Sequence, residues 1–175
     1  NLVAICEKHN IKLIHISTDY VFDGEASKPL KEDEETSPIG VYGETKLEGE
    51  KFVTNSNINY IIIRTSWLYS NFGNNFFKTI FRLANEKSEL NVISDQVGSP
   101  TYANDLAECI LKILPMMKKS NNGIYHFSNE GVASWFDFAE EIVSKHKIDC
   151  VVNPIESIDY KTLVDRPYYS VLNKS

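Results

Sequence analysis

The sequence has little of what marks secreted, membrane-spanning or nucleic-acid-binding proteins. Its 175 residues include only three cysteines, which are odd in number and far apart, so they indicate buried thiols in a reducing compartment and exclude a disulfide framework. The longest purely aliphatic run, Ile61 to Ile63, is far too short to span a membrane. A net charge of −6 without a basic block argues against nucleic acid as a partner. We therefore expect a cytoplasmic protein.

Metal-binding patterns are missing as well, because no group of histidine, cysteine and acidic residues has the spacing of metal ligands. Histidines 15 and 126 lie inside apolar runs, and we interpret both as satisfied core residues. We interpret Trp135 in the same way, and we place His9 and His146 at the surface.

Apolar runs typical of strands alternate with amphipathic segments typical of helices, which predicts an α/β protein with largely parallel strands. The pattern predicts strands at 12–17, 58–69, 89–94 and 123–128, and helices at 2–9, 38–53, 74–87, 103–115 and 136–145. Ser37 is a plausible cap for the second helix, with Pro38 at its first position, and Ser134 with Asp137 forms a capping-box pattern. Residues 151–155 and the tail look less regular.

Polar side chains follow the first predicted strand, in the stretch "STDYVFDG" at residues 17–24. Open sheets of parallel strands bind their ligands at the carboxyl ends of the strands. The stretch is compatible with an active site and with an ordinary loop.

Tyr42 and Lys46 stand four positions apart on the predicted helix 38–53, so they share one face. By itself the pair is also compatible with an exposed aromatic–lysine contact. An ammonium held beside a phenol stabilises the phenolate, and such a phenol can protonate the alkoxide that forms when a ketone accepts hydride. A lysine at this place can also bind the ribose of a nicotinamide cofactor.

Several further motifs join these in chain order: "YGETKLEGE", "RTSWLYS", "DQVGSPTYANDLA", "GIYHFSNEGVASWFDFAEEI" and "DRPYYSVL". Together they resemble the dTDP-4-dehydrorhamnose reductase family of extended short-chain dehydrogenase/reductases, over nearly the whole chain. The resemblance implies a Rossmann-like parallel sheet with a small substrate-binding α/β subdomain. It also implies reduction of the 4-keto group of dTDP-4-dehydro-L-rhamnose to dTDP-L-rhamnose by NADPH or NADH, and it makes a homodimer possible.

The resemblance also implies roles for five residues. Tyr42 would be the general acid, with Lys46 as its partner and a cofactor ligand, and Thr18 would assist the tyrosine and touch the sugar. Asp19 would hydrogen-bond the substrate, and Trp67 would pack on the deoxysugar. Without that context, Trp67 is as well explained as a core residue, Thr18 as a strand terminus and Asp19 as a turn cap.

Other motif residues have weaker implied roles. Arg166 would face a phosphate or form a structural ion pair. Four residues would shape a loop near the sugar nucleotide: Gln96, Gly98, Pro100 and Thr101.

The sequence departs from this family in three places. The glycine-rich dinucleotide fingerprint is absent, since Gly40 and Gly43 lie within the tyrosine segment. The chain stops soon after "RPYYSVLNKS", and Tyr169 stands where the family usually has asparagine. We therefore expect a piece of a longer reductase that is inactive alone, with residues 1–70 from the dinucleotide-binding domain. Residues 71–175 would be mainly substrate-binding and return to the sheet near 124–128.

Two alternatives to this function stay open. One is a non-catalytic regulatory or binding relative, like the methionine adenosyltransferase beta subunit. The other is a reductase or epimerase of another nucleotide sugar.

Overall fold

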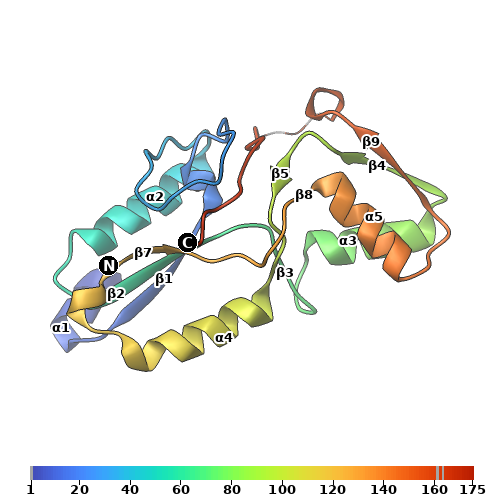
Figure 1. Cartoon of the computed structure of the whole chain (residues 1–175). Helices are drawn as coiled ribbons and strands as arrows, with labels where there is room; N and C mark the ends of the chain where they lie inside the picture. Colours follow the sequence, from blue (N-terminus) through green and yellow to red (C-terminus); the bar gives the residue numbers. More distant parts are fainter. Residues whose placement is uncertain (1, 161, 163) are drawn as a thin grey trace.

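A parallel sheet of three strands forms the centre of the larger part of the molecule (Figure 1). The computed structural model describes residues 2–160, 162 and 164–175. The strands β1 (Leu13–Thr18), β2 (Tyr60–Thr65) and β7 (Gly123–His126) lie in the order β1-β2-β7, with Thr18 beside Thr65. The predicted α/β class with parallel strands is confirmed.

Helices cover both faces of this sheet. The helix α2 (Val41–Thr54) lies on one side, and α4 (Ala103–Ile113) lies on the other (Figure 1). Leu106 of α4 is buried against Ile61 and Ile63 of β2. The short helix α1 (Leu2–His9) precedes β1. No helix in the described part of the chain is long and apolar enough to cross a membrane.

A second group of elements lies to the right in Figure 1. The helices α3 (Phe76–Glu86) and α5 (Trp135–Lys145) pack on a parallel pair of strands, β4 (Glu89–Ile93) and β9 (Val151–Ile155). The buried side chains Ile80, Leu90 and Ile142 belong to one apolar cluster. The predicted capping box of Ser134 and Asp137 is present at the start of α5.

Two short strand pairs lie between these groups: β3 (Leu68–Tyr69) with β6 (Thr101–Tyr102), and β5 (Val97–Gly98) with β8 (Ala133–Ser134). The division into domains at residue 70 stays a prediction, because α4 and β7 belong to the second range and yet pack on the central sheet.

Three predicted elements were wrong in detail. The helix expected from Pro38 begins at Val41, because the backbone of Gly40 is extended, with φ −161° and ψ 162°, and serves as the cap. The strand expected over 58–69 ends at Thr65, where Trp67 adopts a positive φ of 47°. Residues 151–155, expected to be irregular, form a strand. Pro154 is tolerated there since β9 pairs only with β4 among the described strands.

Candidate active site

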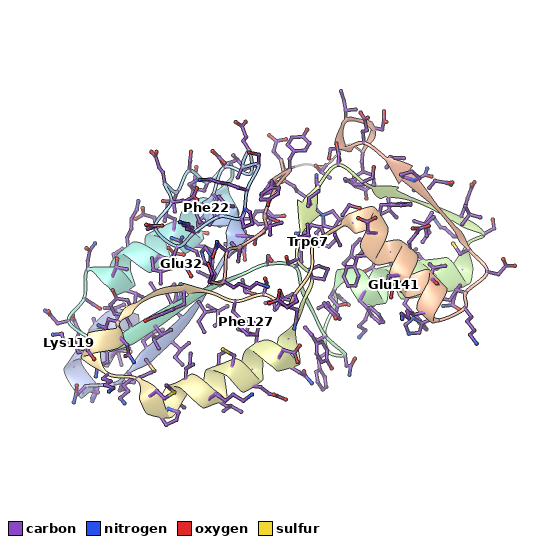
Figure 2. All side chains as sticks on the ribbon, viewed as in Figure 1. Phe22, Glu32, Trp67, Lys119, Phe127 and Glu141 are labelled. Atoms are coloured by element: carbon purple, nitrogen blue, oxygen red, sulfur yellow. The ribbon has the colours of Figure 1, made fainter. Side chains whose placement is uncertain are left out.

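A cavity of about 570 Å³ opens at the carboxyl ends of β1 and β2, between the two groups of elements. Trp67, labelled in Figure 2, lies at this junction. The lining includes Thr18, Asp19, Tyr42, Lys46, Trp67, Trp135 and Arg166. The structure therefore brings all five predicted site residues to one cavity. The roles that the resemblance gives them stay predictions.

Thr18 ends β1, and its hydroxyl forms two local hydrogen bonds. Its Oγ1 donates to Oδ1 of Asp19 at 2.9 Å and accepts from the backbone N–H of Tyr20 at 3.2 Å. Both Thr18 and Asp19 are buried, although they line the cavity. One lone pair of the Thr18 hydroxyl remains available to accept a further hydrogen bond.

The carboxyl group of Asp19 is unusually placed for an acid. Its Oδ2 is buried and has no hydrogen-bond partner among the described residues. Burial raises the pKa of Asp19 to about 7, against the smaller opposing effects of the Thr18 hydroxyl, the nearby Ser170 hydroxyl and backbone N–H groups. Near neutral pH this group is therefore able to offer a proton or a lone pair to a ligand in the cavity.

Helix α2 carries Tyr42 and Lys46 on the face that borders the cavity. Tyr42 is 55% exposed, and its ring meets the ring of Tyr20 edge-on at 5.5 Å between centroids. The ammonium of Lys46 donates to the backbone carbonyl of Ile16 in β1, which ties the lysine to the strand that ends in Thr18. Two of its three N–H bonds remain for other partners.

A buried ion pair, which sequence reasoning missed, fastens α2 to the sheet. Glu50 accepts hydrogen bonds from Nε and Nη2 of Arg64 at 3.0 and 2.7 Å, and it also accepts one from the hydroxyl of Ser17. Glu50 and Arg64 are each only 2% exposed. The signal in the sequence was an arginine inside the apolar strand "IIIRT", because a buried guanidinium needs a carboxylate partner. Glu50 thus connects α2 with β2 through Arg64 and with β1 through Ser17. Thr18 ends β1, and Trp67 follows β2.

Trp67 is held in a strained conformation beside the cavity. A positive φ of 47° is uncommon for a bulky residue and costs free energy. The backbone N–H of Thr101 donates to its carbonyl at 3.1 Å. Gly98 makes room for the indole, since a Cβ at position 98 would lie 2.5 Å from Cε2 of Trp67. Gly98 and Thr101 thus support Trp67 and do not themselves line the cavity.

The interpretation of Trp135 as a core residue describes only one of its two environments. Trp135 packs against the apolar cluster of α3 and α5, but it also lines the cavity and stacks on Trp67. Its Nε1–H donates to Oε1 of the buried Gln96 at 3.2 Å. Sequence reasoning missed it because the residue opens a helix whose periodicity alone explains an apolar side chain.

The remaining candidates divide as follows. Arg166 is exposed at the cavity and forms no ion pair with any described residue. His126 donates from Nδ1–H to the carbonyl of Asn173. Nε2 of His126 and Nε2 of His15 have no partner in the described structure, so neither ring is fully satisfied. The described residues contain no group of three or more histidine, cysteine and acidic side chains that would hold a metal ion.

Comparison with known families decides the affiliation of this chain. A family model described as the RmlD substrate binding domain matches residues 1–175. The chain belongs to this family.

Two curated relatives show how far the similarity extends. The dTDP-4-dehydrorhamnose reductase of Aggregatibacter actinomycetemcomitans is 42% identical over 175 aligned positions, which cover 95% of this chain and 60% of that protein. The spore coat polysaccharide biosynthesis protein SpsK of Bacillus subtilis is 42% identical over 160 positions, which cover 91% of this chain and 55% of that protein. The chain therefore spans little more than half the length of these relatives.

Solved structures agree with this affiliation. The dTDP-4-dehydrorhamnose reductase of Bacillus anthracis, in complex with NADP, superposes with a TM-score of 0.92 at 40% identity over 99% of this chain and 60% of that one. The dTDP-4-dehydrorhamnose reductase of Clostridium acetobutylicum superposes with a TM-score of 0.94 at 44% identity, over 99% of this chain and 60% of that one. The UDP-glucuronic acid 4-epimerase of Bacillus cereus, at 24% identity and a TM-score of 0.77 over 99% of this chain and 56% of that one, shares the fold.

Proposed function

We propose that this chain supplies the substrate side of a reductase that converts dTDP-4-dehydro-L-rhamnose to dTDP-L-rhamnose with NADPH or NADH. The observation that carries the proposal is the meeting of Thr18, Tyr42 and Lys46 at one cavity, although they come from two separate elements. The names of the relatives and the NADP of the Bacillus anthracis structure support the same activity and the same class of cofactor.

The residues present fit one end of a nicotinamide cofactor. Tyr42 exposes its side chain at the cavity, and the anchored ammonium of Lys46 has free N–H bonds, so these two would hold the nicotinamide ribose. When bound, the cofactor supplies the hydride that reduces the carbonyl carbon. The described residues offer no glycine-rich turn between a strand and a helix for the pyrophosphate, so the remaining contacts are assigned to no residue of this chain.

The site residues divide the other tasks of the reaction. Tyr42 gives its phenolic proton to the carbonyl oxygen as that oxygen gains negative charge, and the Lys46 ammonium stabilises the resulting phenolate. The remaining lone pair of Thr18 accepts a hydrogen bond from a hydroxyl of the sugar, which assists Tyr42 by orienting the neighbouring carbonyl toward its phenolic proton. Asp19 hydrogen-bonds the sugar through its unpartnered Oδ2, and Trp67 packs against the apolar face of the deoxysugar.

Arg166 is proposed to meet the diphosphate, because it is exposed at the cavity and its planar guanidinium suits phosphate oxygens. We further propose a homodimer, a cytoplasmic location, no nucleic-acid partner, and the domain division at residue 70. The presence of Thr18, Tyr42 and Lys46 together speaks against a non-catalytic regulatory relative, which has no need of a proton donor.

The test joins this chain to the part of the Bacillus anthracis reductase that it does not cover, and follows NADPH oxidation with dTDP-4-dehydro-L-rhamnose. We expect turnover, and we expect Tyr42→Phe to lower the rate by roughly 10²–10⁴-fold, the usual effect of losing a positioned acid. Tyr60→Phe, on β2 and away from the cavity, is the control and should retain the rate. An undiminished Tyr42→Phe enzyme would refute the mechanism. Preference for a UDP-sugar would favour the alternative of another nucleotide sugar.

A further inference from the structure

The two tryptophans of the chain lie together at the cavity. Their rings stack with 3.5 Å between centroids and an interplanar angle of 6°. Trp67 follows β2, whereas Trp135 is the first residue of α5, so the stack joins the two groups of elements. Both residues are half-buried, so part of each indole remains accessible from the cavity.

A chain of polar side chains that starts at the buried Gln96 holds Trp135 in place. Gln96 accepts the indole N–H and, through Nε2, donates to Oγ of Ser157 at 2.9 Å. Ser157 donates in turn to Oδ1 of Asp95 at 2.6 Å. This chain of hydrogen bonds fixes the orientation of the indole ring. A tryptophan that only fills space in an apolar core does not need such a fixed orientation.

The stack itself is not the arrangement that two indoles prefer. Aromatic pairs favour offset or edge-to-face contacts over a parallel face-to-face contact at short distance. Here the surroundings determine how the two rings lie. Trp67 has a strained backbone and packs against Gly98, which has no Cβ to displace it. Trp135 is held by its hydrogen bond to Gln96. Strain that the surroundings maintain beside a cavity points to a role in binding.

We propose that Trp135 is a second substrate-contacting residue, and that the parts of the two stacked indoles left accessible at the cavity form one aromatic wall against which the deoxysugar of the nucleotide sugar packs. This inference rests on the proposed function and deepens it. The wall buries the apolar C–H face and the methyl group of the sugar, while Asp19 and Thr18 meet the hydroxyl side from β1.

The test measures binding of dTDP-L-rhamnose and of dTDP to the 175-residue chain by calorimetry. Trp135→Leu keeps apolar volume but removes the aromatic surface, so it should weaken dTDP-L-rhamnose binding by roughly tenfold or more and leave dTDP binding unchanged. Phe76→Leu is the matched control, because Phe76 packs on Trp135 at 4.6 Å between centroids but does not line the cavity. It should change neither affinity by more than about twofold. Trp135→Phe, the more conservative change, should give an intermediate loss for the sugar nucleotide alone.

The outcomes separate this inference from the function on which it rests. Equal losses in Trp135→Leu and Phe76→Leu, or an equal loss for dTDP and dTDP-L-rhamnose, would overturn the contact between Trp135 and the sugar. Binding that is normal in both Trp135 variants would overturn it as well, while the proposed function stands. If the unaltered chain binds neither ligand, the proposed function fails, and this inference falls with it. Since both tryptophans line the cavity, a change in tryptophan emission on adding dTDP-L-rhamnose is a second expected result.

Discussion

Gly43 of α2 lies directly against the backbone carbonyl of Tyr20: a Cβ at position 43 would stand 2.1 Å from that oxygen. Glycine is therefore the residue that lets the first turn of α2 touch the segment following β1. This contact sets the position of Tyr42, which directly precedes Gly43 on the same turn, relative to Thr18.

We expect Gly43→Ala to push α2 away from β1. Overpacking against a backbone atom should cost about 1–3 kcal/mol of stability, and a displacement on the order of 1 Å at the acid should lower the rate roughly 10²-fold. Gly40→Ala is the control, because a Cβ there meets only a side-chain atom at an ordinary 3.6 Å. Urea denaturation and NADPH oxidation in the joined enzyme measure the two effects. Equal behaviour of both variants would contradict the assigned contact.

Breaking the buried ion pair of Glu50 and Arg64 from one side should lower the free energy of unfolding strongly. Arg64→Met leaves the Glu50 carboxylate buried without its cation, so we expect a loss of about 3–5 kcal/mol in the free energy of unfolding. Combining it with Glu50→Gln removes the charge and keeps an acceptor for Ser17, so the double variant should be more stable than Arg64→Met alone. Urea unfolding tests this, and a double variant that is no more stable than Arg64→Met alone would contradict it.

Asp19 should make stability fall as the pH rises. Its pKa is about 7 in the folded protein and roughly 3.9 in an unfolded chain, so between these values the folded state holds a proton that the unfolded state has lost. The free energy of unfolding should therefore decline by up to about 1.4 kcal/mol per pH unit from pH ~4 to ~7, and no further above that range.

Asp19→Asn removes this titration and still offers an oxygen to the Thr18 hydroxyl. The stability of the variant relative to the unaltered chain should rise between about pH 4 and pH 7 and then level off. Urea denaturation at several pH values measures the difference, which cancels the titration of His15 and His126. A difference that stays constant with pH would show that Asp19 titrates normally.

Lys46 should matter for both rate and cofactor affinity. Lys46→Met keeps most of the stem but loses the ammonium that binds the Ile16 carbonyl, so it should raise the Michaelis constant for NADPH and lower the rate. Lys46→Arg keeps the charge and should retain more of both. Steady-state kinetics of the joined enzyme separate the two parameters, and a normal Michaelis constant in Lys46→Met would remove the lysine from the cofactor contacts.

The sequence alone determined the alternation of strands and helices, because hydrophobic periodicity and local caps act within a few residues. The apolar runs predicted β1 and β7, and the pattern of Ser134 with Asp137 predicted the start of α5. The motifs also named Thr18, Asp19, Tyr42, Lys46 and Trp67 as one set, and all of them line one cavity.

Only the tertiary structure decided how that set is supported. Glu50 and Arg64 stand on different elements, as do Trp67 and Trp135, and their partnership depends on distances across the chain that no local pattern contains. The start of α2 is a further example, since the extended Gly40 caps the helix in place of the local signal of Ser37 and Pro38. Packing between distant segments decides such contacts, because the free energy of burying and pairing groups exceeds the small preferences of single residues.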